Sequence, residues 1–440
     1  MKRVLVISYY WPPSGGSGVQ RWVKMCKYLP STGWQPVVYT PENPALTSTD
    51  YTLSADIPPQ VEVVRRRIVE PGQFARKSTG AQVTPINGQK KTLKQRVAMW
   101  IRGNCFIPDP RVVWVPSSVR FLKKYLKAHP VDAIVSTGPP HSMHLIARRV
   151  ALATGIPWVA DFRDPWTRMF YFKHLSLTGI SCRIHEKLES KVLRDATVVV
   201  AVSPLVQKEF RAMTSTPVEL VTNGFDDSDF PFGAVACDAP ARDDAQVSSP
   251  SRFTLVHAGL FASDGNPLSL WRAIADLRRE DAAFAERFRL VLCGKTDKAV
   301  LDSIARAGLE DCTENLGYIS HTEVVALMKS ASALMLPLRQ EPEYRATLPG
   351  KLFEYLASRR PVIGIGQKDG AMAAILSRTT AGDTFDWDQM QEMKQWLKNA
   401  FDAFLQGKLY ENKADLTEFS RKGLAQRYAV LLDKLIDNYE

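Results

Sequence analysis

Short apolar runs rich in β-branched residues alternate with longer amphipathic stretches along most of this 440-residue chain. Runs of four to eight apolar residues are typical of buried strands, and apolar positions three and four apart are typical of helices. The alternation predicts an α/β fold with parallel sheets covered by helices. We expect strands at 4–10, 36–40, 61–67, 133–137, 158–162, 197–202, 218–222, 253–257, 289–293, 314–316, 333–337 and 362–365, and helices that include 19–28, 142–154, 180–194 and 204–212.

Between residues 227 and 252 the alternation gives way to an acidic stretch that becomes rich in Ala, Asp, Ser and Pro. That composition is typical of a linker. A chain of this length is also too long for one ordinary hydrophobic core. We therefore predict a first domain at 1–226, a linker at 227–252, a second domain at 253–415 and a long C-terminal helix within 416–440.

A helix with an apolar face is expected after residues 71–92, which have the composition of a mobile loop. Leu93, Val97, Trp100 and Ile101 share one face of this helix, and basic residues surround them. We favour the interpretation that this face packs on its own domain. The alternative is an interfacial helix that lies on an anionic membrane.

Charge is distributed unevenly along the chain, whose net charge is +11. Residues 1–225 contain 31 Lys and Arg against 14 Asp and Glu, a balance of +17, while the remaining 26 basic and 32 acidic residues give −6. A basic first half favours an anionic partner, such as a phosphorylated acceptor or a membrane surface. No nucleic-acid-binding signature accompanies it, so nucleic acid is not an expected partner.

Membrane-spanning and metal-binding classes find no support in the sequence. No run of about 18 apolar residues occurs, and the apolar residues 4–10 lead into Trp11-Pro12-Pro13 without a cleavage site, so we expect a strand there and no signal peptide. The six cysteines are scattered without metal-ligand spacing. We expect free thiols in a reducing cytoplasm and no metal site.

Two loops that follow predicted strands could bind a ligand. The first contains Gly15, Gly16 and Gly18 and precedes a helix, so backbone N–H groups could approach an anion there. It departs from the dinucleotide fingerprint, because Arg21 stands where the third glycine is expected. The second contains His141 in the turn after strand 133–137, while His144 lies on the following helix and is expected to pack there.

Asp161, Arg163, Asp164 and Trp166 cluster at the end of a third strand, 158–162. A structural Asp–Arg pair is the plain explanation, because charges are rarely buried without partners. The functional interpretation is that the carboxylates accept sugar hydroxyls and the indole stacks on a sugar ring.

The segment from Glu341 to Ser358 carries the most informative motif. We expect a helix with Thr347 as its N-cap and Pro349 in its first turn. Lys351 and Glu354 are three residues apart, so they share one face of this helix. A surface ion pair would explain them, but a cation and a carboxylate near a helix N-terminus also suit a nucleoside diphosphate.

With this motif, nearly the whole chain resembles the family-four retaining glycosyltransferases, and in particular a bacterial branch with a Pro-x-Lys-Leu-Phe-Glu-Tyr-Leu-Ala signature that acts in surface-polysaccharide assembly. The resemblance implies the GT-B fold, in which two Rossmann-like, doubly wound domains face a central cleft and the C-terminal helix crosses back to the first domain. The segments that carry it are Pro12–Gly16, Asp161–Trp166, Ser203, Val221–Asp226, His257–Gly259, Gly294, Gly317-Tyr318 and Pro349–Ala357.

The resemblance also implies roles for individual residues. The second domain would bind the donor, with Lys351 on the diphosphate, Glu354 on the ribose, and Gly259, Gly317 and Tyr318 beside them. Gly15 and Gly16 would approach the donor from the first domain. Asp161, Arg163, Asp164 and Lys351 would serve catalysis, and His141 and Trp166 would bind the acceptor.

Two positions depart from the family's pattern. A glutamate that is frequent eight positions before the ribose glutamate is replaced by Ala346, although Glu341 and Glu343 lie nearby. The cation expected after the first strand of the second domain is replaced by Asn266. Neutralisation of the phosphates would therefore fall on Lys351, with Arg339 or Arg345 as further candidates.

The expected function is transfer of a hexose or N-acetylhexosamine, with retention and without a metal or other cofactor, from a nucleoside-diphosphate sugar to a glycan acceptor, free or lipid-linked. The expected location is the cytoplasm, at the inner face of the cytoplasmic membrane. One alternative is a sugar-nucleotide epimerase of the same fold, which would convert the donor alone. Another is a non-catalytic nucleotide-sugar-binding protein, which Ala346 and Asn266 make plausible.

Overall fold

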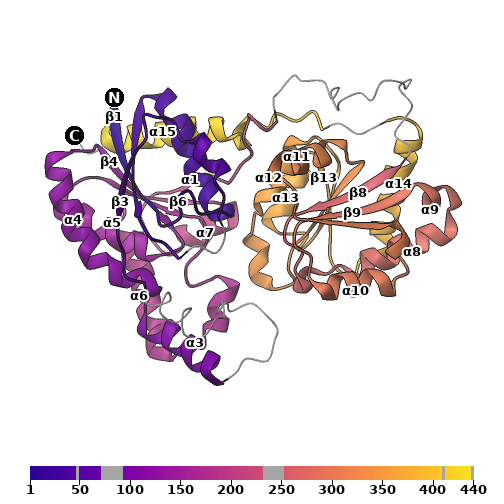
Figure 1. The fold of residues 1–440 in the computed structure, drawn as a ribbon, viewed down its shortest axis with the longest axis horizontal. Helices are drawn as coiled ribbons and strands as arrows, with labels where there is room; N and C mark the ends of the chain where they lie inside the picture. The colour runs from indigo at the N-terminus through magenta and orange to yellow at the C-terminus, as the bar shows by residue number, and fades with distance from the viewer. Residues whose placement is uncertain (46–48, 71–92, 231–251, 409–411, 438–440) are drawn as a thin grey trace. The chain divides into compact units, whose positions relative to one another are not determined.

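The computed structural model describes residues 1–45, 49–70, 93–230, 252–408 and 412–437 (Figure 1). The loop expected at 71–92 and most of the linker expected at 227–252 lie outside these residues. The chain divides into two compact units. The first comprises Met1–Asn223 with Arg421–Glu440, and the second comprises Gly224–Ser420.

The first unit is built on a seven-stranded, wholly parallel sheet of order β3-β2-β1-β4-β5-β6-β7. Strand order reverses between β1 and β4, and in open parallel sheets the crevice at the carboxyl ends of such strands is the usual ligand site. The strands are β1 (Lys2–Ile7), β2 (Trp34–Pro41), β3 (Glu62–Arg66), β4 (Ala133–Gly138), β5 (Trp158–Phe162), β6 (Val198–Ala201) and β7 (Val218–Leu220).

Helices connect these strands, and most of them bury an apolar face. They are α1 (Ser17–Tyr28), α3 (Leu93–Cys105), α4 (Val115–Ala128), α5 (Ser142–Thr154), α6 (Gly179–Asp195), α7 (Pro204–Arg211) and α15 (Arg421–Asp437). Strands β1, β2 and β4 are buried almost throughout, which explains why their sequences are nearly continuous apolar runs.

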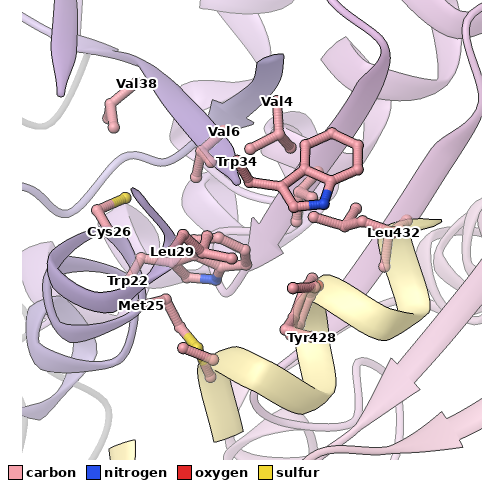
Figure 2. Close-up of a cluster of buried hydrophobic side chains, with 14 of the residues drawn as sticks. Val4, Val6, Trp22, Met25, Cys26, Leu29, Trp34, Val38, Tyr428 and Leu432 are labelled. Atoms are coloured by element: carbon pink, nitrogen blue, oxygen red, sulfur yellow. The ribbon is translucent and has the colours of Figure 1, made fainter. Parts of the chain in front are cut away.

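The C-terminal helix α15 completes the core of the first unit. Figure 2 shows Tyr428 of α15 on the side of Trp22 and Leu29, and Leu432 of α15 beside Trp34 of β2. The rings of Trp22 and Tyr428 meet edge to face at 5.2 Å between centroids, a favourable aromatic geometry. Residues at the two ends of the chain therefore share one hydrophobic core.

The second unit contains a six-stranded parallel sheet of order β10-β9-β8-β11-β12-β13. Its strands are β8 (Phe253–Ala258), β9 (Phe288–Cys293), β10 (Thr313–Gly317), β11 (Ala333–Pro337), β12 (Val362–Ile365) and β13 (Gly382–Phe385). Its helices are α8 (Leu268–Glu280), α9 (Ala282–Arg287), α10 (Lys298–Arg306), α11 (His321–Ser330), α12 (Gly350–Ala357), α13 (Ala371–Arg378) and α14 (Met390–Leu405).

Every strand expected from the sequence is present in the structure, with ends that differ by up to three residues, whereas β13 was not foreseen. Its sequence, Gly-Asp-Thr-Phe, contains no apolar run, because an edge strand is only half covered. Thr347 as a helix N-cap was wrong: a 3-10 helix, Pro342–Ala346, is followed by extended residues, and α12 begins at Gly350 with Pro349 as its N-cap. Leu348 precedes Pro349, and a residue before proline disfavours the helical conformation, so α12 does not begin earlier.

Candidate functional site

The carboxyl ends of β8, β9 and β10 meet at three glycines in the second unit. Gly259, Gly294 and Gly317 have φ angles of +136°, +115° and +62°, which L-residues rarely adopt. The N–H of Gly259 donates to the carbonyl of Cys293 (2.7 Å), and the N–H of Gly294 donates to that of Gly317 (2.6 Å). A Cβ on Gly294 would lie 2.3 Å from the carbonyl oxygen of Gly259. These loops therefore form a backbone surface with no room for a side chain at Gly294.

Helix α12 places Lys351 and Glu354 beside these glycines. The two side chains form an ion pair and are 27% and 14% exposed, so neither points into bulk solvent. The stem of Lys351 lies so close to Gly259 that a Cβ there would be 3.8 Å from its Cγ. Tyr355, one residue after Glu354, accepts a hydrogen bond from the N–H of Ala258 (2.8 Å) through its hydroxyl oxygen. That bond fixes α12 against the end of β8.

Two buried groups surround the Lys351 ammonium. Burial lowers the pKa of His257 to about 4, and the nearby Lys351 charge lowers it further, so this imidazole is neutral at pH 7. Burial raises the pKa of the Cys293 thiol, against a smaller lowering by Lys351. Neither of these two groups adds a charge beside the ion pair of Lys351 and Glu354.

His321 stands at the start of α11, close enough to Glu354 and Lys351 for both charges to act on it. A hydrogen bond to Asp229 (3.0 Å) is the main cause that raises its pKa, and Glu354 raises it further. Tyr318, which we expected beside the donor, is 92% exposed. Within the described residues no hydrogen bond joins Tyr318 to Lys351 or Glu354.

The positions that depart from the family's pattern have structural partners. The Asn266 amide donates to Ser303 Oγ (2.9 Å) and its oxygen accepts from Trp271 Nε1 (2.7 Å). Ala346 ends the 3-10 helix before α12. The candidate cations are also paired: Arg339 with Asp264 at 2.7 Å, and Arg345 with Asp369 at 2.6 Å.

In the first unit, Arg163 ties together the loops that follow β1 and β4. Its guanidinium donates to the carbonyls of Gly18 (2.5 Å) and Pro139, and it lies over the ring of Tyr10. Gly16 has a φ of +96° at the start of α1, and a Cβ there would meet no atom within 4 Å. Gly15 is half-buried beside it. Arg163 thus holds the loop in which Gly15 and Gly16 lie.

Asp161 and Asp164 have different surroundings, although they are three residues apart. Asp161 is inaccessible to solvent and accepts hydrogen bonds from Arg21 (2.7 and 3.0 Å) and Trp22 (2.7 Å). This placement favours the structural ion pair over contact with a ligand. Asp164 is half-buried, and burial raises the pKa of its carboxyl. Among the described side chains it has no hydrogen-bond or ion-pair partner, so it is the open carboxylate of the motif.

His141 and Trp166, our two candidates for acceptor binding, lie against each other. Their rings stack with centroids 4.7 Å apart and planes 4° apart. Trp166 Nε1 donates to His185 Nδ1 (3.0 Å), and its backbone N–H donates to the buried Glu189 (3.2 Å). The structure therefore brings His141 and Trp166 together with two residues that we had not singled out.

The sequence contained evidence for a structural role of Arg21, a residue that we had not singled out. Arg21 lies on the apolar face of α1 between Val19 and Trp22, and a buried arginine requires a partner. His185 and Glu189 look like ordinary polar positions of a surface helix, so no local pattern distinguishes them. In the described part of the chain, no group of three or more His, Cys, Asp and Glu residues is arranged to hold a metal ion. None of the described helices is long and apolar enough to span a bilayer.

Comparison with known proteins finds similarity in both units. Residues 15–224 match a model described as "Glycosyl transferase 4-like domain", and residues 252–395 match one described as "Glycosyl transferases group 1". No curated protein sequence matches the chain.

Solved structures extend the similarity over the whole chain. A glycosyltransferase from Rickettsia africae has 13% identity and a TM-score of 0.64, with 99% of each chain covered. Sucrose-phosphate synthase from Thermosynechococcus elongatus has 14% identity and a TM-score of 0.65, with both chains fully covered. WaaG, a glycosyltransferase involved in lipopolysaccharide biosynthesis, has 14% identity, a TM-score of 0.52 and 99% coverage of each chain. At such identities these neighbours establish the fold, two parallel-sheet α/β domains of the GT-B kind.

Proposed function

Because both of its domains match glycosyltransferase families, this chain is a glycosyltransferase of the GT-B type, and we propose that it moves a hexose or N-acetylhexosamine from a nucleoside-diphosphate sugar to a glycan acceptor in surface-polysaccharide synthesis. The observation that carries the proposal is the position of Lys351 and Glu354. Both lie half-buried on α12 beside the glycines at the strand ends of the second unit. This position supports a nucleoside-diphosphate site over a structural surface ion pair as the role of Lys351 and Glu354.

Donor binding would use the charges and the free N–H groups of α12 together. The Lys351 ammonium would neutralise the diphosphate, and the positive end of the helix dipole at Gly350 would add to this. Glu354 would accept hydrogen bonds from the ribose hydroxyls. The two side chains pair with each other, so a donor would exchange that ion pair for contacts of its own.

Transfer would depend on stabilising the negative charge that develops on the leaving diphosphate. In the second unit, Lys351 and the backbone N–H groups at the start of α12 are the candidates, because preorganised donors of this kind commonly lower the barrier of a reaction more than any other effect. No divalent metal is needed in this scheme. The acceptor would bind to the first unit, where His141, Trp166 and Asp164 lie. If it attacks the sugar on the face that the diphosphate leaves, the anomeric configuration of the sugar is retained.

The test is a thermal-shift screen of nucleoside-diphosphate sugars, followed by a transfer assay. A donor at 100 times its Kd stabilises the folded protein by about 2.7 kcal/mol, which a melting curve detects. Lys351→Ala and Glu354→Ala should each abolish the shift and the transfer. The matched control is the exposed pair of Lys398 and Asp402 on α14, whose alanine variants should behave like the wild type.

Three outcomes would redirect the assignment. If no nucleoside-diphosphate sugar shifts the melting temperature, the donor site is absent. A shift without transfer to any glycan would favour a binding protein. Conversion of the donor alone into its epimer would favour the epimerase.

Contact with an anionic membrane at the inner face of the cytoplasmic membrane is part of the proposal, because the apolar face of α3 is exposed. We had expected this face to pack on its own domain. Leu93, Val97, Trp100 and Ile101 are instead 75%, 50%, 47% and 42% exposed. The helix contains Lys and Arg but no Asp or Glu. An exposed apolar stripe among basic residues is typical of an interfacial helix.

Vesicle sedimentation tests this contact. The wild type should sediment with anionic vesicles at low salt and be released at high salt, because salt screens the attraction. Trp100→Gln should weaken sedimentation, whereas Leu152→Gln, at a position on α5 that is 64% exposed, should not. Equal behaviour of the two variants would argue against a role for α3.

A further inference from the structure

A small cavity lies beside His141 in the first unit. Its volume is about 160 Å³, and its walls come from the carboxyl end of β4, the C-terminal end of α3, the loop before α4, and α6. Four prolines, at positions 108, 110, 139 and 140, line it and offer no backbone N–H. The polar side chains of its lining include those of His141, His185 and Arg111.

The ring of His185 presents a donor to this region. Its Nδ1 accepts a hydrogen bond from Trp166 Nε1, which can only donate. The proton of the neutral ring must therefore sit on Nε2. That nitrogen is shielded from solvent. The backbone of Gly103 is near enough to raise the pKa of the ring, but no hydrogen bond of normal geometry satisfies the nitrogen among the residues that the structure describes.

His141 and Arg111 add further nitrogens without a hydrogen-bond partner, although the Arg111 guanidinium is in an ion pair with Glu70. Both ring nitrogens of His141, a residue only 5% exposed, lack a hydrogen-bond partner within the described part of the chain. The same holds for Arg111 Nε, which lies 3.4 Å from Glu70 Oε1 without hydrogen-bond geometry. The carboxylate of Asp109, which also lines the cavity, already accepts from the backbone N–H groups of Arg111 and Ser142, each at 2.9 Å.

Donors outnumber acceptors among these unpaired groups. His185 Nε2 and Arg111 Nε can only donate, and neutral His141 offers one donor and one acceptor. A buried donor left unpaired costs about 1–3 kcal/mol, so a ligand or ordered water is expected to satisfy such groups. A ligand that suits this set supplies several acceptor oxygens, as an oxyanion does. The Arg111 guanidinium adds a positive charge that Glu70 and Asp109 partly offset.

We propose that this cavity binds a phosphate group of the acceptor, with His141, His185 and Arg111 as its donors. The proposal rests on the proposed function, in which the first unit receives the acceptor. A space of 160 Å³ equals about five water molecules at ~30 Å³ each, which is enough for a phosphate but below the size of a drug-sized pocket.

The phosphate could come from a soluble sugar phosphate or from a phosphate that links a glycan to a lipid. The structure favours the lipid source because of α3. Arg102 and Gly103, at the C-terminal end of this helix, line the cavity, and the exposed apolar residues Leu93 to Ile101 precede them on the same helix. A lipid chain that lies along the exposed apolar residues of α3 would thus have its phosphate end at the cavity.

The experiment is direct binding, followed by nitrogen-15 NMR of the imidazole signals in the full-length protein without any donor. The probes are inorganic phosphate, a hexose 6-phosphate, the unphosphorylated hexose, and neutral detergent micelles with or without a polyprenyl phosphate. The signals of His141 and His185 should move with phosphate-bearing probes and not with the hexose. Because no nucleotide sugar is present, a failure of the proposed donor site would not affect this result.

The key variant is His141→Phe, which keeps a ring to stack on Trp166 and removes both nitrogens. It should weaken phosphate binding at least tenfold while the protein still folds, as judged by its melting curve. The matched control is His129→Phe, because His129 stacks on Tyr125 outside the cavity with centroids 4.6 Å apart. If His141→Phe fails to fold, His185→Leu takes its place with the same expected loss.

The outcomes separate the possibilities. Binding of hexose 6-phosphate assigns a soluble acceptor, and binding confined to polyprenyl phosphate assigns a lipid-linked one; both support the proposal. It is overturned if no phosphate-bearing probe moves the two histidine signals, if the unphosphorylated hexose binds as tightly, or if His141→Phe binds phosphate like the wild type.

Discussion

The guanidinium of Arg21 on α1 and the carboxylate of Asp161 at the end of β5 form a salt bridge of 2.7 Å that is almost closed to solvent, with side chains 1% and 0% exposed. Arg21 also donates to the carbonyls of Val221 (3.0 Å) and Thr222 (2.7 Å). One buried guanidinium therefore joins the first helix, the central sheet and the end of the first unit's main segment. Its hydrogen bonds satisfy the charge that burial would otherwise penalise.

Breaking this pair should destabilise the first unit strongly. We expect Arg21→Met to lower its free energy of unfolding by about 3–5 kcal/mol, because Asp161 would remain as an uncompensated buried charge. Urea unfolding followed by tryptophan fluorescence measures the change. Lys2→Met, which breaks the exposed pair with Asp433, should cost less than about 1 kcal/mol. Similar losses in both variants would contradict this account.

Mild acid should destabilise the first unit. Burial lowers the pKa of His144 to about 3 and of His185 to about 4, and that of His141 well below its ordinary value. In the folded protein these three imidazoles stay neutral, whereas in the unfolded chain they take up protons below about pH 6.5. The free energy of unfolding therefore has its full value above that pH and falls as the pH drops towards 4. Three histidines give a slope of about 4 kcal/mol per pH unit.

Urea unfolding at pH 7.5, 6.5 and 5.5 measures that slope. His144→Asn should reduce it by about a third, because one of the three groups no longer titrates. His129→Asn changes an exposed histidine and should leave the slope unchanged. A slope that His144→Asn does not reduce would show that these buried rings are not its cause.

Gly294→Ala should damage the proposed donor site through the backbone. The new Cβ would overlap the carbonyl of Gly259, and the φ of +115° would be strained, so the two loops must move apart. We expect a loss of about 1–3 kcal/mol in the stability of the second unit and the loss of nucleotide-sugar binding. Gly308→Ala is the control, since its φ is also positive but its Cβ would meet open space. That variant should be only mildly destabilised and should bind the donor normally.

Tyr428 and Leu432 should respond differently to truncation. Leu432 of α15 is fully buried in the core of the first unit, so Leu432→Ala should cost about 2–5 kcal/mol (Figure 2). The hydroxyl of Tyr428 is buried, and no described group bonds to it. Tyr428→Phe should therefore be neutral or stabilise the protein by about 1 kcal/mol. Melting temperatures decide both points, and a large loss in Tyr428→Phe would reveal a partner for the hydroxyl.

The sequence alone determined the class of fold, the order of the elements and one feature of the candidate site. Strand and helix periodicities are local, so buried strands such as β4 and β5 could be located within a few residues. The spacing of Lys351 and Glu354 likewise determined that they share a helix face, because three residues make nearly one turn. The edge strand β13 was missed because an edge strand needs no apolar run. The start of α12 was misplaced because Pro349 and Gly350 outweighed the capping preference of Thr347.

Only the tertiary structure decided which distant residues meet. Arg21 and Asp161 are 140 residues apart, and the pairing of β1 with β4 and β4 with β5 brings them together. The same folding places His141, Trp166 and His185 around one cavity, and leaves the apolar face of α3 exposed where local pattern had favoured packing. Periodicity shows that a side chain lies on the apolar face of an element. What covers that face depends on the packing of the whole chain, which no local pattern encodes.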